Sequence, residues 1–456
     1  MKRVLLVAIA ACFAAACAPP TDTPSGSANA NAPAPSAAAS PAPPAGAAPA
    51  TGEAAQPVTL PVLDAMFQEP AFADELKSRL ALTDEQVARL RRAAEEETTS
   101  LGEEEENGAR STAAATRRAT EKIGEIVGAD KLPQFASFVR TRWAGGESGL
   151  PATLPSKANS VPTDTRVVVN APAFRMDVFE NGQLVKTYRV GIGYPEFPLP
   201  QGLRKANQII FNPTWTPPDE PWVKGKLRPG EKVEAGSKLN PLGPIKIPIG
   251  LPSLIHGGKS PARLGSFASH GCVGLTDKQV SDFSVLLARL GGAADVTAES
   301  VAELAKKKTE TKTVRLGRDV PVELRYETIV VEDGKLYVYR DVYEKGTNTE
   351  ENLRAVLAAH GVRFEDLSEQ ERAQALEALK AMARDPQGNP VAGTPTPTPT
   401  PDKQGNVRET RTVKGQKEVV IEIAALRGKG YPAAADLDTG GAPQPKASPA
   451  PKKQRA

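Results

Sequence analysis

The strongest constraint on the fold is an alternation of apolar and polar residues that begins at Arg166. The stretch RVVVNAPAFRMDVFENGQLVKTYRVGIG carries Asn181-Gly182 between two such runs. Alternation with a period of two is typical of a half-buried strand, and an Asn-Gly pair favours a two-residue hairpin turn. The sequence therefore predicts a β-hairpin here. Shorter runs punctuated by proline and glycine predict a β-rich domain over 166–297.

One helix is expected within this domain, in the stretch TDKQVSDFSVLLARLGG. Thr276 and Gln279 form a capping-box pattern at its start, and Gly291 follows its last apolar residue. Residues 311–345 predict further strands that turn at Asp333-Gly334. We expect these strands to extend the β domain.

Helical regions are predicted on both sides of the β-rich part. Residues 58–145 contain apolar positions at helical spacing, and Thr83 with Gln86 forms another capping-box pattern. We interpret this region as a structural helical hairpin. Residues 349–385 predict one or two more helices, where His360 is assigned no role.

The two ends of the chain differ from this folded part in composition. Residues 18–57 consist largely of Ala, Pro, Ser, Gly and Thr, so they predict a disordered tether. Residues 386–456 contain TPTPTPTP and a tail rich in lysine and proline, which predicts a low-complexity, mostly disordered region. Within it, KEVVIEIAAL (417–426) predicts a lone strand.

Residues 1–17 predict a lipoprotein-type export signal. A positively charged start precedes an apolar run from Val4 to Ala14, which is too short to span a bilayer. Three alanines then lead into Cys17, and this pattern resembles a lipobox, whose cysteine is lipidated. An ordinary cleaved signal is the alternative. We expect an exported protein at the periplasmic face of the cell envelope, lipid-anchored through Cys17.

The charge and the cysteine content of the chain limit the classes of function that it can have. The 57 basic and 54 acidic residues nearly balance, which gives no indication of the clustered basic face that a nucleic-acid partner needs. Of the three cysteines, Cys12 and Cys17 lie in the predicted signal. Cys272 is then left without an intramolecular partner, and an unpaired thiol in an exported protein indicates reactivity.

The residues that can carry chemistry lie in LIHGGKSPARLGSFASHGCVGL (254–275). A thiol needs a base because the thiolate is the nucleophile. His256 ends one predicted strand and Cys272 begins another, so neighbouring strand ends can bring the two side chains within hydrogen-bond reach. Backbone N–H groups around Gly271-Cys272, close to the start of the next helix, can form an oxyanion hole.

Two other interpretations stay open from the residues alone. Cys272 can be a small buried side chain, although Ser269, His270 and Gly271 do not make an apolar run. His256, His270 and Cys272 can instead be three zinc ligands, although the usual zinc spacings are absent.

Ser269-His270-Gly271-Cys272-Val273, with His256-Gly257 upstream, resembles the signature of the L,D-transpeptidase catalytic domain. RMDVFENGQLVKTYRVGIGYP, NPTWTPP, NPLGPIKIPIG and DGKLYVYRDVY are similar to other stretches of this family. The resemblance covers roughly 166–345. It implies a mainly β fold, a β-sandwich with short helices, preceded here by the α-helical N-terminal region.

The resemblance also implies roles for the site residues. Cys272 corresponds to the nucleophile, which attacks the stem-peptide carbonyl before a terminal D-alanine of peptidoglycan and forms an acyl-enzyme. An amine or water then attacks this acyl-enzyme and releases the cysteine. His256 corresponds to the proton donor and acceptor, and His270, Ser269 and Gly271 to positions that shape the site. The family needs no cofactor or metal and is acylated by carbapenem-type β-lactams. We expect a monomer.

The sequence departs from the family at Gly274, where arginine is usual. Arg263, in the loop between His256 and Cys272, is a candidate substitute. The departure also motivates an alternative, a non-catalytic peptidoglycan-binding protein on a degenerate transpeptidase fold. The presence of Cys272 and both nearby histidines favours the enzyme, because a binding protein has no need of a reactive thiol.

Overall fold

The computed structural model describes residues 57–67, 69–103, 111–145, 159–216, 232–250, 252–385, 388, 390, 413 and 415–441. The predicted signal, nearly all of the predicted tether and the TPTPTPTP repeat lie outside these residues. Within the described ranges, no helix is both long enough and apolar enough to cross a membrane.

The N-terminal region is helical, as predicted, but its described residues form five helices and not the helical hairpin that we expected. Its helices are α1 (Leu60–Phe67), α2 (Pro70–Leu80), α3 (Asp84–Glu103), α4 (Thr112–Val127) and α5 (Leu132–Gly145). The predicted capping box is present before α3: the Thr83 N–H donates to Gln86 Oε1 at 3.0 Å, and the Gln86 N–H donates to Thr83 Oγ1 at 3.1 Å. The apolar faces of the helices share one core, in which Leu63, Phe72 and Leu90 are fully buried.

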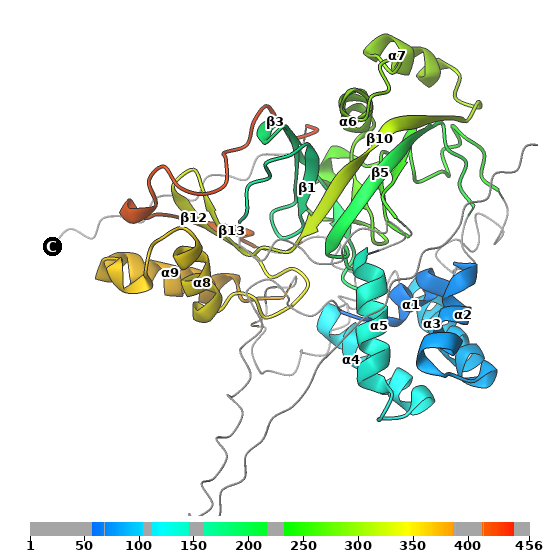
Figure 1. Cartoon of the computed structure of the whole chain (residues 1–456), viewed down its shortest axis with the longest axis horizontal. Coiled ribbons are helices and arrows are strands. Elements are labelled where there is room, and N and C mark those ends of the chain that lie inside the picture. Colours follow the sequence, from blue (N-terminus) through cyan, green and yellow to red (C-terminus); the bar gives the residue numbers. More distant parts are fainter. Residues whose placement is uncertain are drawn as a thin grey trace, which may run out of the picture. The chain divides into compact units, whose positions relative to one another are not determined.

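The main feature of the β-rich part is a nine-stranded mixed sheet in the order β14-β3-β2-β1-β10-β5-β6-β7-β9. The strands are β1 (Arg166–Asn170), β2 (Arg175–Glu180), β3 (Gln183–Arg189), β5 (Gly202–Phe211), β6 (Ile245–Pro248), β7 (Leu254–His256), β9 (Val273–Gly274), β10 (Lys312–Arg325) and β14 (Leu437–Asp438). The long strands β5 and β10 pair antiparallel in its middle (Figure 1). β1 is parallel to β10, and β7 is parallel to β9.

Both predicted hairpin turns are confirmed. Asn181 and Gly182, between β2 and β3, have φ angles of 50° and 81°. Asp333 and Gly334 have φ angles of 47° and 75° and join β11 (Ile329–Glu332) to β12 (Lys335–Tyr339). Two successive positive φ angles are the geometry of the hairpin turn whose twist matches the flanking strands.

Two helices follow the end of β9, α6 (Asp277–Leu290) and α7 (Ala298–Lys306). The predicted capping box is confirmed, since the Gln279 N–H donates to Thr276 Oγ1 at 3.2 Å and the Thr276 N–H donates to Gln279 Oε1 at 3.0 Å. Phe283 and Leu287 are fully buried in the core of the nine-stranded sheet. Burial of such side chains stabilises a fold by about 2 kcal/mol each. The packed helix therefore fixes the chain just after Cys272.

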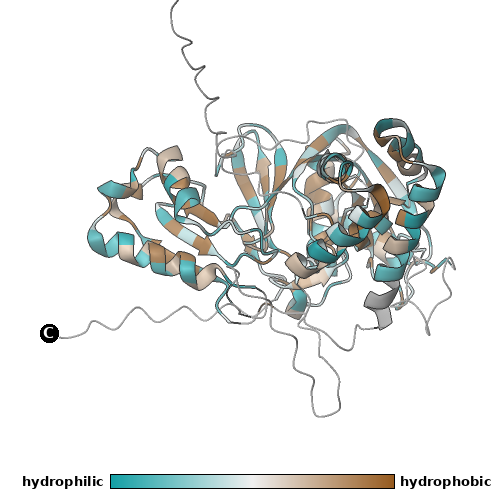
Figure 2. Ribbon diagram, turned by 90° about the horizontal axis from the view of Figure 1, so that it is seen from below, coloured by the Kyte–Doolittle hydropathy of each residue, from teal (hydrophilic) through white to brown (hydrophobic). Residues whose placement is uncertain are grey.

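A separate three-stranded sheet has the order β11-β12-β13, with β13 spanning Glu418–Glu422. The helices α8 (Glu350–Ala359) and α9 (Glu369–Met382) share its apolar core, which includes Leu336, Leu353 and Ile421. Figure 2 shows hydrophobic and hydrophilic stretches alternating around these helices, as expected when one face covers a sheet. We had expected residues 311–345 to extend the β domain. This holds for β10, which lies in the nine-stranded sheet, but β11 and β12 pair with β13 instead.

The C-terminal region is more ordered than its composition indicates. The strand predicted over 417–426 is not alone, because β13 pairs antiparallel with β12 and places Ile421 opposite Leu336. Farther along, β14 adds a parallel strand beside β3. Residues 415–441 are thus folded, in contrast to the mostly disordered region expected for 386–456. The partner strands of β13 and β14 lie far away in the sequence, so no local pattern indicates the pairing.

The fold class is a mixed sheet with helices rather than a mainly β chain. Of the described residues, 37% are helical and 25% lie in strands. The excess of helix comes from the N-terminal region and from α8 and α9. The β-sandwich arrangement implied by the resemblance stays a prediction.

Candidate active site

Cys272 lies in the short turn between β8 (Phe267–Ser269) and β9. It is a free cysteine and only 8% exposed. Ser269 closes the turn, because its Oγ accepts the Cys272 N–H at 3.1 Å and donates to the Cys272 carbonyl at 2.5 Å. Gly271 has a φ of 79°, a conformation that side chains rarely adopt, and its carbonyl accepts a hydrogen bond from Ser253 Oγ at 2.9 Å. Both neighbours therefore fix the backbone at Cys272.

This turn differs from the expectation in one respect. We expected backbone N–H groups of the Gly271-Cys272 peptide region to face an oxyanion. The Cys272 N–H instead donates to Ser269 Oγ. A carbonyl oxygen approaching this N–H would have to share it with the serine hydroxyl.

His256 stands at the end of β7, beside the strand that follows Cys272. The parallel pairing of β7 and β9 places His256 opposite Gly274, and the Leu275 N–H donates to the His256 carbonyl at 2.8 Å. The predicted pairing of the two strand ends is thus confirmed. The contacts of Cys272 Sγ are with the carbonyls of Pro252 at 4.0 Å and His270 at 3.9 Å, and its hydrogen bond with His256 stays a prediction. The imidazole is almost completely buried, with Nδ1 at 2.8 Å from the Gly257 carbonyl. Because a carbonyl only accepts, Nδ1 donates its proton to Gly257, and the Leu242 carbonyl is a second backbone partner of the ring.

The charge states of the two residues follow from burial. Burial lowers the pKa of His256 well below its usual value, and nearby Lys259 lowers it further. Burial raises the pKa of the Cys272 thiol, while Lys259 and Arg204 oppose that rise. Near neutral pH the resting pair is therefore a neutral imidazole and a protonated thiol, so the thiol needs a base to become a nucleophile.

His270 is held between two aromatic rings. Its ring packs edge-on against Tyr194 and Phe197, with centroid distances of 5.1 and 4.7 Å. The Tyr194 hydroxyl in turn accepts a hydrogen bond from Arg263 Nη2 at 3.1 Å. Arg263, our candidate for the missing family arginine, thus supports the aromatic neighbour of His270.

The zinc interpretation gains no support from the side-chain arrangement. Within the described part of the chain, no group of three or more His, Cys, Asp or Glu side chains is placed to hold a metal ion. The proposed ligands His256, His270 and Cys272 therefore do not converge on one point.

Two cations near Cys272, Lys259 and Arg204, were not predicted as site residues. Arg204, on β5, is fully buried; its Nη1 donates to the Gly250 carbonyl at 2.9 Å and its Nη2 to the Trp143 carbonyl. Burial lowers the pKa of Arg204 to about 10. Alternation along β5 puts Arg204 on the same buried face as Ala206. A charged residue on an apolar face was the signal that could have identified it.

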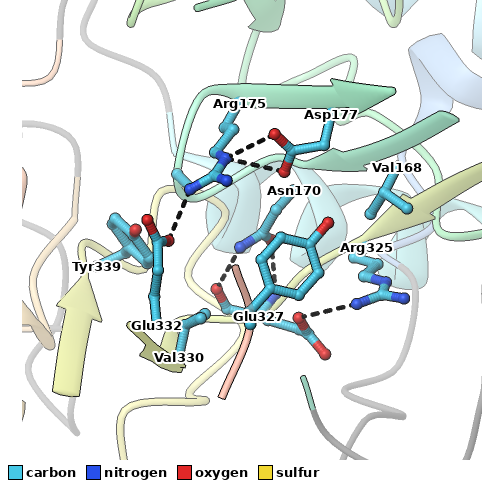
Figure 3. A pocket seen from close by; sticks show the side chains of 11 residues that line it. Val168, Asn170, Arg175, Asp177, Arg325, Glu327, Val330, Glu332 and Tyr339 are labelled. Atoms are coloured by element: carbon cyan, nitrogen blue, oxygen red, sulfur yellow. Dashed lines mark hydrogen bonds and ion pairs between the residues drawn. The ribbon is translucent and has the colours of Figure 1, made fainter. Parts of the chain in front are cut away.

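A small cavity elsewhere in the fold is lined by charged residues (Figure 3). Arg175 donates to Asp177 at 2.8 Å and to Glu332 at 2.6 Å, which connects β2 to β11. The guanidiniums of Arg175 and Arg325 also lie near the Tyr431 ring. No predicted site residue lines this cavity. Its ion pairs link the nine-stranded and three-stranded sheets.

Comparison with known proteins finds a family match within the β-rich part. Residues 164–296 match the YkuD family, the L,D-transpeptidase catalytic domain. This confirms the family recognised from the motif around Cys272, for this part of the chain. Members of the family are enzymes of acyl transfer. Among curated proteins, none matches the sequence at a significant level.

Several solved structures are similar to part of the chain. The catalytic domain of an Enterococcus faecium L,D-transpeptidase has 16% sequence identity and a TM-score of 0.23, and the match covers 36% of this chain and 99% of that one. An L,D-transpeptidase from Mycobacterium smegmatis has 15% identity and a TM-score of 0.22, over 36% of this chain and 58% of that one. L,D-transpeptidase 3 from Mycobacterium tuberculosis, solved with a faropenem-derived adduct, has 15% identity and a TM-score of 0.21, over 35% and 60%.

Proposed function

We propose that this protein is a peptidoglycan L,D-transpeptidase with Cys272 as the nucleophile and His256 as its base. The observation that carries the proposal is the position of His256 and the hydrogen bond that its ring makes to Gly257. Its Nδ1 is bound to the Gly257 carbonyl, and the residue lies on a strand adjacent to the one that follows Cys272. The match of 164–296 to the transpeptidase family supports the same chemistry.

The reaction begins when His256 Nε2 takes the proton from Cys272 Sγ. The thiolate attacks the stem-peptide carbonyl that precedes a terminal D-alanine, so a C–S bond forms and the peptide C–N bond breaks. His256 returns the proton to the leaving amine of D-alanine. An amine of a neighbouring stem then attacks the thioester, so a C–N bond forms and the C–S bond breaks. His256 takes the proton of the attacking amine, the sulfur leaves as thiolate, and His256 then returns the proton to the sulfur.

The other predicted residues would act by shaping the site. Ser269 and Gly271 hold the turn that presents the thiol, and His270 forms part of the aromatic wall with Tyr194 and Phe197. No metal or organic cofactor takes part in this scheme. We further propose that the enzyme is exported, anchored through Cys17 and monomeric, which suits an insoluble substrate near a membrane.

The test is intact mass of the full chain after incubation with a carbapenem, beside Cys272→Ala. We expect an adduct of one carbapenem on the wild type and none on the variant. A second reaction, release of D-alanine from a disaccharide-tetrapeptide fragment of peptidoglycan, should show the same dependence on Cys272.

A folded wild-type chain that forms no adduct and releases no D-alanine would contradict the proposal. Retention of such a chain on sedimented peptidoglycan would favour the non-catalytic binding protein instead. Equal adduct on the wild type and on Cys272→Ala would show that another side chain is acylated.

A further inference from the structure

The space beside Gly274 is filled by the side chain of Lys259. A Cβ atom built on Gly274 would lie 2.8 Å from Lys259 Cγ, 3.1 Å from Cε and 3.4 Å from Cδ. The first of these distances is shorter than carbon atoms tolerate. Any side chain at position 274 would therefore have to displace the lysine.

The backbone gives no separate reason for glycine at this position. Gly274 is not among the described glycines with positive φ, so its conformation is open to other residues. Its strand also cannot easily move away, because Gly274 and Gly191 exchange two backbone hydrogen bonds of 2.9 Å each. Glycine at position 274 therefore leaves the space that the Lys259 side chain occupies.

The loop that carries Lys259 is fixed on both sides of the site. The Lys259 N–H donates to the Leu275 carbonyl at 3.1 Å, and the Gly258 N–H donates to Asp277 Oδ1 at 2.7 Å. Lys259 follows His256 by three residues, and its side chain crosses β9 two residues beyond Cys272. Its charge therefore acts on both members of the proposed catalytic pair.

Cys272 is the neighbour of Lys259 that becomes anionic when the thiol loses its proton. Burial lowers the pKa of Lys259 to about 8, Cys272 raises it, and Arg263 lowers it. Arg204 on β5 also acts on the thiol, and Lys246 on β6 also acts on His256. A partly buried ammonium is stabilised when an opposite charge forms beside it.

We propose that Lys259 is a positioning cation for the reaction, whose ammonium stabilises the thiolate of Cys272 and whose path across β9 requires Gly274. The inference rests on the proposed role of Cys272 as nucleophile. Lys259 transfers no proton in this scheme: the proton of Sγ goes to His256 Nε2, and the lysine acts only through its charge. Arg263, which bonds to Tyr194, has a different neighbour.

The experiment measures the pH dependence of Cys272 alkylation by iodoacetamide, followed by the mass of the Cys272-containing peptide from the full chain. Lys259→Met should move the thiol limb of the profile upward by about one pH unit, which lowers the rate at neutral pH about tenfold. Lys259→Arg keeps the charge and should stay near the wild type. Lys278→Met removes an exposed lysine on α6 and should leave the profile unchanged.

Gly274→Ala provides an independent check, because it displaces the lysine without removing a charge. We expect its profile to move in the same direction as that of Lys259→Met. A wild-type profile in both Lys259→Met and Gly274→Ala would overturn the inference. If Lys259→Met fails to fold, Gly274→Ala and Lys259→Arg still decide the question. A wild-type Cys272 that reacts with neither iodoacetamide nor a carbapenem would instead overturn the proposed function.

Discussion

The hydroxyl of Ser269 offers the sharpest test of how the turn holds Cys272. Ser269 is buried, and its Oγ bonds to both the N–H and the carbonyl of Cys272. Ser269→Ala would leave these two backbone groups without that partner in a site that is 8% exposed at Cys272. A buried polar group left unsatisfied costs about 1–3 kcal/mol. We take about 2 kcal/mol for the N–H.

Because the chain has several packed cores, a single unfolding transition would not report on this turn. Amide hydrogen exchange reports on the turn, because it measures local opening of the structure. A loss of about 2 kcal/mol corresponds to exchange that is about 30-fold faster, because about 1.4 kcal/mol is a factor of ten. The assay is hydrogen-exchange mass spectrometry of a peptide that spans 267–275, combined with the rate of carbapenem acylation, which should fall.

The controls separate the hydroxyl from a general effect of substitution. Ser269→Thr keeps the oxygen and should retain protection of the 267–275 peptide. Ser281→Ala removes an Oγ on α6 that donates to the Asp277 carbonyl at 2.8 Å in an exposed position, and should change neither exchange nor acylation. Exchange and acylation in Ser269→Ala equal to those of the wild type would refute the reasoning.

Three further predictions follow from the site and the fold. Burial and Lys259 lower the pKa of His256, so the native state binds fewer protons there than the unfolded state does. The contribution of His256 to stability is therefore complete above about pH 6.5 and is lost as the pH falls below that value. His256→Gln should weaken this pH dependence in thermal unfolding measured from pH 5 to 8. Gly182→Ala should destabilise the hairpin by about 1 kcal/mol, because a Cβ would be strained at φ 81° and would lie 3.3 Å from the Thr163 backbone. A melting temperature equal to that of the wild type would contradict this prediction. Treatment with EDTA should leave D-alanine release unchanged, and loss of activity that zinc restores would revive the metal interpretation.

Local patterns predicted the local parts of the fold. Asn181-Gly182 and Asp333-Gly334 form the expected turns, and the capping boxes at Thr83 and Thr276 start the expected helices. In each case the residues that interact lie within a few positions of one another. The pairing of the strand ends at His256 and after Cys272 was also accessible, because both ends lie in one short segment with a recognisable motif.

Contacts between distant segments could not be read in the same way. β13 completes a sheet whose other strands lie about eighty residues earlier, and nothing within 417–426 specifies that partner. Lys259 appeared to be an ordinary loop lysine, since only the parallel alignment of β7 with β9 brings it over Gly274. The sequence showed Gly274 as a departure from the family and suggested Arg263 as the compensating cation, whereas the side chain beside Gly274 is that of Lys259.

The return of the C-terminal segment to the two sheets has a consequence for proteolysis. A single cut between α9 and β13 would divide the polypeptide, yet β13 would remain bonded to β12 along its length, with Ile421, Ile423 and Leu426 buried against α8 and α9. The two fragments should therefore migrate together under native conditions and separate only in denaturant. Genetic removal of the same segment should have another effect. β12 would then expose an unpaired edge, which strands of other chains can join.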